Sequence, residues 1–318
     1  MSLQPLFRKF HELIQLKQYD QNAELRQKRD ILLGRLRDKL RPRTFEFFNQ
    51  GSYAMGTGIK PSPGSHDYDY DMDIGLVFDL DHRTTDPHSV KEWVYQALFG
   101  HTQDVQWRTP CITVNYREAR EPKYHVDLAV MAREPNGALH LALCPHNAQA
   151  NLRKWQPDGR QKFIQAIQSR FDNSEDDFQF RRVVRFLKRW KNEHFPREGR
   201  AAPSGLSLTV AAHQWFRPVK QQTRQGVEYD DLLATAALVD KMRQGFQSVR
   251  DGNGQYTPRL ILRFPFEPHD DVLTRMSHQQ MSEFLGRLEK LSGWLEEARR
   301  TQNAAPLRRA FGEQFPIA

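Results

Sequence analysis

The stretch Tyr-Asp-Tyr-Asp-Met-Asp-Ile-Gly-Leu-Val-Phe, residues 68–78, decides the fold of this chain. Polar and apolar side chains alternate strictly along it, with aspartates at Asp69, Asp71 and Asp73. A period of two is typical of a β-strand that buries one face. Residues two apart in a strand point to the same side, roughly 6.5–7 Å from each other. The pattern therefore predicts a half-buried strand whose open face carries carboxylates.

Two carboxylates of this strand are spaced to bind divalent cations. Asp71 and Asp73 could hold a pair of metal ions about 3.5–4 Å apart. A third carboxylate, Asp127, lies in the apolar run 124–131, where an ionised side chain is costly to bury unless a cation or hydrogen bonds stabilise it. Asp69 with Asp71 has the same spacing, but the apolar strand continues directly from Asp73, which favours the later pair. The plain alternative is a solvated strand face, with Asp127 capping a turn or pairing with an arginine.

A glycine–serine turn precedes these carboxylates. Residues 44–50 alternate well enough for a strand, and Gln50, Gly51 and Ser52 follow at its end. Glycine lets the backbone approach a phosphate closely, while N–H groups and a serine hydroxyl donate hydrogen bonds to it. Mg²⁺ prefers oxygen ligands and is often held by carboxylates and phosphates together. The pair alone is usually only a turn, but the turn and carboxylates in this order predict a nucleoside triphosphate site with two metal ions.

The remaining patterns divide the chain into two parts. The first contains a helix over 3–41, broken near residues 19–22, and then a mixed sheet. The second is dominated by helical periods, with a turn at 251–254 and a strand-like piece at 260–264. Its expected helices are 160–171, 178–194, 204–217, 230–247, 278–299 and 304–313. We therefore expect an α+β fold, in which residues 1–155 form a mixed-sheet lobe with a long N-terminal bridging helix and residues 156–318 form a helical lobe that closes the nucleotide cleft.

Composition sets the class and setting of the protein. The 318 residues include 38% hydrophobic and 11% aromatic residues, which suffices for a globular core without disulfides. Two cysteines, Cys111 and Cys144, exclude a disulfide framework and a zinc ribbon, and favour a reducing cytoplasm. No apolar run is long enough to cross a bilayer, and the N-terminus does not read as a secretory signal. The net charge of +8 favours a polyanionic partner such as nucleotides or nucleic acid.

The expected helix over 178–194 is strongly basic. Six of the eleven residues from 181 to 191 are Lys or Arg, beside an apolar stripe. Such a helix usually has one core face and one solvated face, and this is the expectation for most of its charges. Lys188 lies about 40° from Val184 around the helix, at the edge of the stripe. It could therefore face a cleft and meet a phosphate there as a point charge.

These motifs resemble the nucleotidyltransferase superfamily that includes DNA polymerase beta, poly(A) polymerase, oligoadenylate synthase and cGAS. The strings GSYAMGTGIKP (51–61), YDYDMDIGLVF (68–78) and YHVDLAV (124–130) are similar to the bacterial cGAS/DncV-like enzymes of anti-phage CBASS systems. Within that group the resemblance is greatest to the clade encoded beside HORMA-domain and TRIP13-like proteins. A zinc insert of the kind found in animal cGAS is not expected, because His66, His125 and His213 are not suitably spaced from the cysteines.

The resemblance implies a polymerase-beta-like fold and a role for each motif residue. Asp71 and Asp73 would bind two Mg²⁺ ions, for which Mn²⁺ can substitute, and Asp127 would bind one ion and help activate the attacking hydroxyl. The implied contacts to the triphosphate come from Gln50, Gly51, Ser52, Lys188 and Ser204. Two departures stand out. The interval from Ser52 to Asp71 is longer than in many relatives and contains Asp67 and Asp69, and Met55 stands where some relatives place a base-stacking tyrosine.

The implied reaction joins nucleotides. The 3′-hydroxyl of one nucleotide attacks the α-phosphorus of another triphosphate, pyrophosphate leaves, and the chain closes into a ring. ATP is the expected main substrate and a cyclic oligoadenylate such as cyclic tri-AMP the product, with a HORMA-domain protein or double-stranded DNA on a basic surface as activator. The alternatives are a transferase that modifies RNA or protein, and a non-catalytic nucleic-acid-binding module on the same fold.

Overall fold

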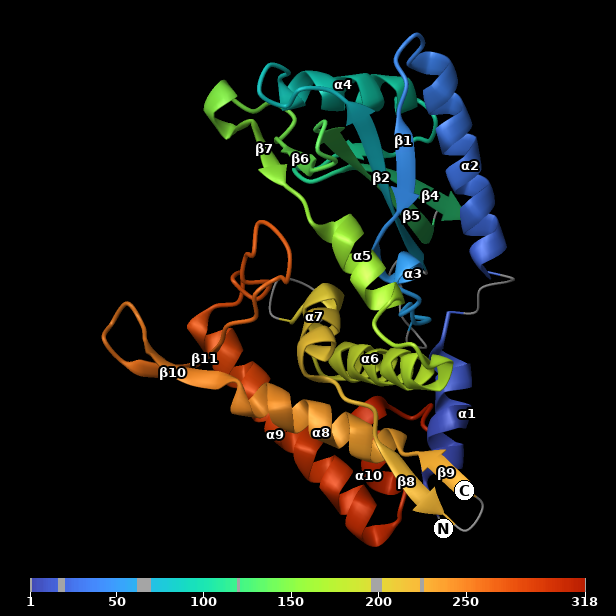
Figure 1. The fold of residues 1–318 in the computed structure, drawn as a ribbon, viewed down its shortest axis with the longest axis vertical. Helices are drawn as coiled ribbons and strands as arrows, with labels where there is room; N and C mark the ends of the chain where they lie inside the picture. The colour runs from blue at the N-terminus through green and yellow to red at the C-terminus, as the bar shows by residue number, and fades with distance from the viewer. Residues whose placement is uncertain are drawn as a thin grey trace.

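A mixed β-sheet and a bundle of helices divide the chain between them (Figure 1). The computed structural model describes residues 2–16, 21–61, 70–118, 121–195, 202–223 and 226–317. The sheet occupies the upper half of Figure 1 and the helices formed by later residues occupy the lower half. The predicted α+β class is confirmed, and the division at residues 155 and 156 stays a prediction.

Within the described residues, seven strands form one sheet. They are β1 (Glu46–Asn49), β2 (Tyr70–Asp79), β3 (Val105–Trp107), β4 (Ile112–Glu118), β5 (Glu121–Arg133), β6 (Leu139–Leu143) and β7 (Lys154–Pro157). The order is β1-β2-β5-β4-β3, and β6 pairs with both β5 and β7. Strands β2 and β5 run parallel, whereas the other pairs are antiparallel. The parallel pair therefore lies inside the sheet, with neighbours on both sides.

The alternation along β2 buries its apolar side chains beneath two helices. Met72, Ile74, Leu76 and Phe78 are almost completely buried. They share a core with α2 (Gln21–Lys39) and α4 (Pro87–Leu98), which cover this face of the sheet. The predicted strand is thus confirmed from residue 70 onward, while the rival carboxylates Asp67 and Asp69 lie outside the described residues.

The N-terminal segment forms two helices that pack in different cores. Helix α1 (Gln4–Ile14) buries Phe7, Phe10 and Ile14 among the helices of the C-terminal half. Helix α2 instead packs against the sheet. Residues 17–20, between the two helices, lie outside the description. The bridge between sheet and bundle is therefore made by two helices rather than by one continuous helix.

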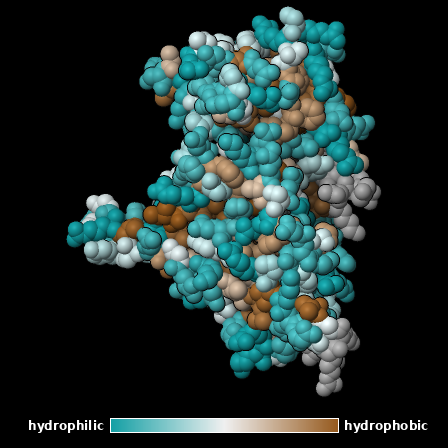
Figure 2. Space-filling model, in the orientation of Figure 1, coloured by the Kyte–Doolittle hydropathy of each residue, from teal (hydrophilic) through white to brown (hydrophobic). Residues whose placement is uncertain are grey.

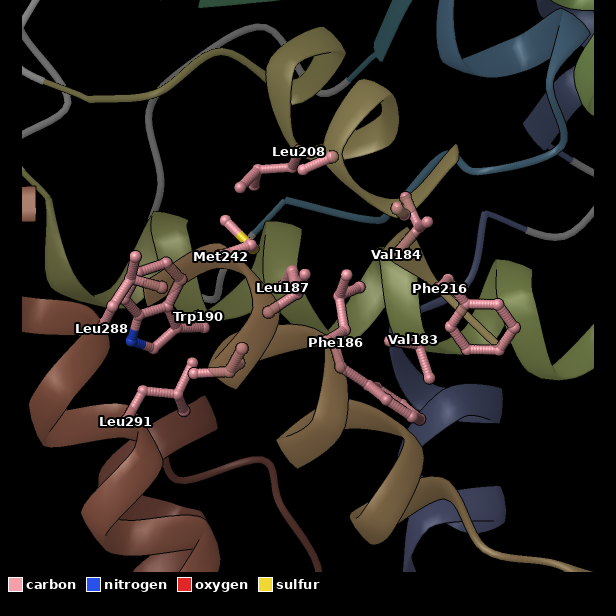
Figure 3. Close-up of a cluster of buried hydrophobic side chains, with 14 of the residues drawn as sticks. Val183, Val184, Phe186, Leu187, Trp190, Leu208, Phe216, Met242, Leu288 and Leu291 are labelled. Atoms are coloured by element: carbon pink, nitrogen blue, oxygen red, sulfur yellow. The ribbon is translucent and has the colours of Figure 1, made fainter. Parts of the chain in front are cut away.

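The C-terminal half packs around one central helix. The helices are α5 (Arg160–Gln168), α6 (Ser174–His194), α7 (Gly205–Trp215), α8 (Asp231–Gln244), α9 (His278–Thr301) and α10 (Ala305–Phe311). Helix α6 contributes Val183, Leu187 and Trp190 to a core that it shares with α1, α7, α8 and α9 (Figure 3). Across the described ranges, none of the helices combines the length and the apolar character that crossing a lipid bilayer requires.

Two hairpins interrupt this bundle, and one corrects the sequence prediction. Strands β8 (Lys220–Thr223) and β9 (Gly226–Tyr229) form a small hairpin that was not predicted. Residues 246 and 247, predicted as helix, begin β10 (Phe246–Arg250), which pairs with β11 (Tyr256–Leu260). The strand predicted at 260–264 therefore lies mostly before residue 260. The turn itself lies at 251–254 as predicted, and Asp251 Oδ1 accepts hydrogen bonds from the backbone N–H groups of Asn253 and Gln255. This hairpin projects from the bundle as an arm (Figures 1 and 2).

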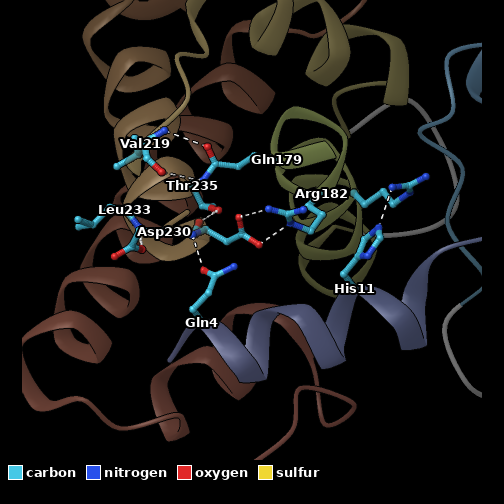
Figure 4. Close-up of polar contacts among 10 residues, drawn as sticks. Gln4, His11, Gln179, Arg182, Val219, Asp230, Leu233 and Thr235 are labelled. Atoms are coloured by element: carbon cyan, nitrogen blue, oxygen red, sulfur yellow. Dashed lines mark hydrogen bonds and ion pairs between the residues drawn. The ribbon is translucent and has the colours of Figure 1, made fainter. Parts of the chain in front are cut away.

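A buried polar network joins α1, α6 and α8 (Figure 4). Arg182 donates two hydrogen bonds to the carboxylate of Asp231, at 2.6 and 2.9 Å. The backbone N–H of Asp231 donates to Gln4 Oε1 at 2.7 Å. Nearby, Arg185 donates to His11 Nε2 at 2.8 Å, and burial together with the charges of the two arginines lowers the pKa of His11 to about 3. His11 is therefore a neutral acceptor at pH 7.

Candidate active site

The carboxylates of Asp73 and Asp127 lie on neighbouring parallel strands. Asp73 on β2 is in register with Asp127 on β5, so only the spacing between adjacent strands, roughly 4.8 Å, separates their backbones. Both residues belong to the sheet face opposite the α2 and α4 core, because their neighbours in sequence are buried in that core. Asp71 lies two residues earlier on β2, in register with His125, and its side chain lies outside the described part of the structure.

Asp127 is held by groups that favour its ionised form. The Thr113 hydroxyl, on β4, donates a hydrogen bond to Asp127 Oδ1, and His125 Nε2 lies 3.6 Å from Oδ2. Burial alone raises the pKa of this carboxyl, but His125, Thr113 and the charge of Arg108 outweigh it and hold the pKa below its usual value. Asp127 is therefore an anion at neutral pH, as a metal ligand must be.

Gly51 brings the backbone directly onto the Asp73 carboxylate. Its φ of +64° is the left-handed conformation that favours glycine. A Cβ at this position would lie 1.9 Å from Asp73 Oδ2. The N–H of the preceding residue, Gln50, donates to the Asp73 carbonyl at 2.7 Å and fixes the turn to β2. The predicted glycine–serine turn and the strand carboxylate thus meet, and only glycine leaves space between them.

Ser52 and Gln50 occupy different surroundings. Ser52 is half-buried in the one-turn helix α3 (Gly51–Ala54), beside the carboxylate turn. The Gln50 side chain is buried on the same sheet face as Asp73, further along the strands, and donates to Met131 Sδ at 3.9 Å. Its amide also packs against Gly75. In this structure Gln50 contributes a backbone bond to the turn, and its side-chain amide lies beside Met131 and Gly75.

Lys188 reaches the same turn region from the helical bundle. Its Nζ donates to the carbonyl and to the hydroxyl of Thr57, each at 3.0 Å. Lysine and threonine are both buried. Burial and the charges of Arg185 and Lys191 lower the pKa of Lys188 to about 7, and the Asp73 carboxylate acts in the opposite direction. Lys188, the predicted cation, is therefore close enough to Asp73, the predicted metal-binding carboxylate, for the two charges to interact.

Ser204 lies beside Lys188 and caps a helix. It precedes α7, and its Oγ accepts a hydrogen bond from the Ser207 N–H at 3.0 Å. A Cβ on the next residue, Gly205, would lie 3.5 Å from Lys188 Cε. Ser204 is exposed, so its hydroxyl combines the capping bond with access to solvent. The structure thus brings Lys188 and the Ser204 turn together.

The segment 54–61, which follows the glycine–serine turn, is bound to α5 and α6 through its carbonyl oxygens. Arg181 donates to Met55 O at 3.1 Å, and Arg185 donates to Gly58 O at 3.1 Å and also to Gly56 O. Arg189 donates to Lys60 O at 2.9 Å, and Gln168 of α5 donates to Ala54 O at 3.1 Å. Arg181 fits because Gly56, with φ of +63°, has no Cβ in its way.

These contacts correct the expected solvated face of the basic helix. Arg182 is paired with Asp231, Arg189 is 1% exposed, and Lys188 is 7% exposed. The contacts of Arg181, Arg185 and Arg189 were not predicted because their partners are main-chain carbonyls, which leave no signal in the sequence. The glycines at 56 and 58 were the available sign that another element approaches this segment closely. Met55, the position noted for base stacking, is buried in the core of the bundle.

Comparison with known proteins relates the part of the chain that contains this site to a known family. Residues 45–131 match the family model "Cyclic GMP-AMP synthase DncV-like, nucleotidyltransferase domain". These residues contain Gly51, Asp73 and Asp127. None of the curated proteins matches the sequence significantly.

Solved structures extend the likeness to the whole chain. CdnG of Bradyrhizobium diazoefficiens, solved with GTP, superposes with a TM-score of 0.70 at 19% identity, over 98% of this chain and 96% of CdnG. CdnC of E. coli MS115-1, solved with ATP, gives 0.67 at 15% identity, over 98% of both chains. DncV of Vibrio cholerae gives 0.59 at 17% identity, over 88% of this chain and 72% of DncV. Residues 45–131 therefore match a DncV-like nucleotidyltransferase domain, and the chain has the fold of the bacterial cGAS/DncV-like enzymes.

Proposed function

We propose that this nucleotidyltransferase condenses nucleoside triphosphates, with ATP as the main substrate, into a cyclic oligonucleotide such as cyclic tri-AMP for anti-phage defence. The observation that carries the proposal is the register of Asp73 with Asp127, with the Gly51 backbone lying against the Asp73 carboxylate. The family match over this region supports nucleotidyl transfer. The GTP and ATP named with the similar CdnG and CdnC structures support a triphosphate substrate.

The donor atoms suit two Mg²⁺ ions. Carboxylate oxygens are the ligands that Mg²⁺ prefers, and the missing Cβ of Gly51 lets the backbone of the turn lie directly against the Asp73 carboxylate. Asp71 and Asp73 would hold both ions, Asp127 would hold one, and Mn²⁺ would substitute. Bound divalent ions lower the pKa of an attacking hydroxyl and neutralise charge on a leaving pyrophosphate.

The chain's own residues would position the triphosphate. The Gly51 and Ser52 backbone would lie along its phosphates, and the Ser52 hydroxyl would donate to them. Lys188 would meet the outer phosphates, and the added negative charge would raise the pKa of its ammonium group and keep it protonated. Ser204 would donate its hydroxyl proton to the phosphates while its oxygen still caps α7. The ionised Asp127, near the reacting ends, would draw the attacking hydroxyl toward the α-phosphorus.

The test is incubation of the purified protein with Mg²⁺ and each α-labelled triphosphate, followed by phosphatase treatment and chromatography. We expect a small phosphatase-resistant product from ATP alone. We expect Asp73→Asn with Asp127→Asn to reduce its formation by well over about 100-fold, because loss of a group that only hydrogen-bonds to a metal ligand can already cost about 100-fold. The matched control is Asp240→Asn, an exposed aspartate on α8 that should leave the rate unchanged. Label found only on added RNA, or on protein, would instead favour the transferase alternatives.

The activator is the second part of the proposal. The similar CdnC of E. coli has been solved in a complex with a HORMA protein, which supports a HORMA-domain partner here. The charge of +8 favours double-stranded DNA as the other candidate. Product formation that needs the HORMA protein would support the first. DNA affinity that falls steeply with added salt would support the second, and no binding at low salt would remove it.

A further inference from the structure

A second cluster of metal-ligand side chains lies far from the nucleotidyl-transfer carboxylates. Glu134 follows the end of β5, seven residues after Asp127, which corresponds to roughly 20 Å along the strand. His82 follows the end of the parallel strand β2, and His140 lies on β6. Because β2 and β5 are parallel neighbours, their carboxyl ends meet at one edge of the sheet. The fold thus brings Glu134 close to His82, which lies 52 positions earlier in the sequence, and to His140, which lies 6 positions later.

The three side chains converge closely. Their potential ligand atoms, two imidazole nitrogens and one carboxylate oxygen, all lie within 4.8 Å of one another. Glu134 Oε1 is 3.0 Å from His82 Nδ1 and 3.8 Å from His140 Nδ1. The two imidazole rings are stacked, with centroids 3.9 Å apart and planes 7° apart. The Nδ1 atoms of both histidines therefore lie near one oxygen, Oε1 of Glu134.

The two nitrogens are not satisfied by these contacts. His82 Nδ1 and His140 Nδ1 are both buried, and neither makes a hydrogen bond with any residue that the structure describes. Their approach to Glu134 has the distance of an ion pair but not the direction of a hydrogen bond. Buried polar atoms are normally paired, and an exception often marks an ion or a water.

The donor set identifies the metal. Two imidazoles and one carboxylate are ligands typical of Zn²⁺, whereas Mg²⁺ prefers oxygens alone. A cavity of about 240 Å³ adjoins His140 and is lined on its other side by Glu267, in the loop between β11 and α9. Glu267 is close enough for its charge to act on His140. This loop already contacts the sheet edge, because Gln156 of β7 donates to Asp270 at 3.1 Å.

We propose that His82, Glu134 and His140 bind one Zn²⁺ ion and that Glu267 supplies the fourth ligand. The metal ties the carboxyl edge of the sheet to the loop of the helical bundle. Binding of this ion is independent of nucleotidyl transfer, so the failure of either proposal leaves the other standing.

The experiment measures zinc binding directly. The full chain is stripped with a chelator, freed of the chelator, and titrated with ZnCl₂ in millimolar MgCl₂, which occupies the oxygen-only site around Asp73. We expect one zinc per chain by calorimetry. We expect Glu134→Gln and His140→Gln each to weaken zinc binding by at least about 100-fold, and Glu267→Gln to weaken it by about 10-fold. For comparison, loss of a group that only hydrogen-bonds to a metal ligand costs about 10–100-fold in affinity. Glu134→Gln is isosteric and lies in a turn, so it keeps the test valid if His140→Gln misfolds.

The matched control is His101→Gln. His101 is another partly buried histidine at the sheet, with its Nε2 3.1 Å from the Tyr116 hydroxyl, and it should leave zinc binding unchanged. Co²⁺ substitution adds a spectroscopic readout, because a tetrahedral site gives intense visible bands that Glu134→Gln should abolish. The proposal is overturned if the unmodified chain binds zinc no more tightly than Glu134→Gln, or if Co²⁺ gives the same spectrum in both.

Discussion

Helix α6 buries two positive charges in opposite ways. Toward α8, the guanidinium of Arg182 meets the carboxylate of Asp231 in a bidentate pair, so each charge neutralises the other. Toward the sheet, the ammonium of Lys188 bonds two neutral oxygens of Thr57, and its pKa falls to about 7. The pair of Arg182 and Asp231 therefore carries no net charge. Under our proposal, the contact of Lys188 would become more favourable when a phosphate binds, whereas Arg182 already has its anionic partner.

The largest effect should come from breaking the ion pair between Arg182 and Asp231. Asp231→Asn leaves the Arg182 charge buried without its partner, and we expect the free energy of unfolding to fall by about 3–5 kcal/mol. Urea denaturation measures it. Asp240→Asn is the control, because its half-exposed pair with Arg243 is worth about 1 kcal/mol or less. Equal losses in the two variants would mean that the Arg182 pair is no more important than a surface contact.

The burial of Lys188 against the neutral oxygens of Thr57 should appear in the pH dependence of the unfolding free energy. The folded pKa of Lys188, about 7, lies below that of an unfolded lysine, so between pH 7 and about 10 the unfolded chain binds more protons. The unfolding free energy of the native chain should therefore rise with pH relative to Lys188→Met, by up to about 1.4 kcal/mol per pH unit. Parallel stability curves for the two proteins would show that Lys188 is not desolvated as described.

The next prediction concerns Gly51, whose backbone lies against the Asp73 carboxylate. Gly51→Ala and Gly100→Ala both place an alanine in the left-handed region, at about 1–2 kcal/mol each. Only the first puts its Cβ against Asp73, since nothing lies within 4 Å at Gly100. We expect Gly51→Ala to lower the rate of product formation by about 100-fold, as a misplacement of about 1 Å can do. Gly100→Ala should keep the native rate, and equal rates in both variants would contradict the close approach.

The smallest effect separates the two roles of Ser204. Ser204→Ala removes the cap of α7 and should cost about 1 kcal/mol of stability, whereas Ser204→Asp keeps a capping oxygen and should cost less. Both should weaken ATP binding, the aspartate more, because it repels phosphate. Thermal melts and ATP titrations test this. An aspartate variant that binds ATP as tightly as the native chain would leave Ser204 with the capping role alone.

The sequence predicted those features whose signal is local. Alternation along β2 marked both its buried face and its open face, and the apolar stripe of α6 marked the core of the bundle. The order of the strands was beyond this reasoning. The register of Asp73 with Asp127 depends on a parallel pair whose members are separated by β3 and β4 in the sequence. A strand pattern identifies a strand but not its neighbour.

Contacts with the backbone escaped prediction for a different reason. Arg181, Arg185 and Arg189 bind carbonyl oxygens, and every residue has a carbonyl oxygen. Their basic helix therefore looked like a solvated face, although it is an interface. The hairpin of β10 and β11 was misplaced by a similar limit, because the turn at Asp251 was recognised but the strands that it joins have no strong alternation.

The attachment of segment 54–61 has a mechanical consequence. In covalent terms the segment belongs to the chain of the sheet, lying between β1 and β2, but its hydrogen bonds attach it to α5 and α6. A rotation of the helical bundle would carry this segment with it, and the Gly51 turn would act as the pivot at the Asp73 carboxylate. The molecule therefore contains a lever whose long arm is the bundle and whose short arm ends at Gly51, against the Asp73 carboxylate.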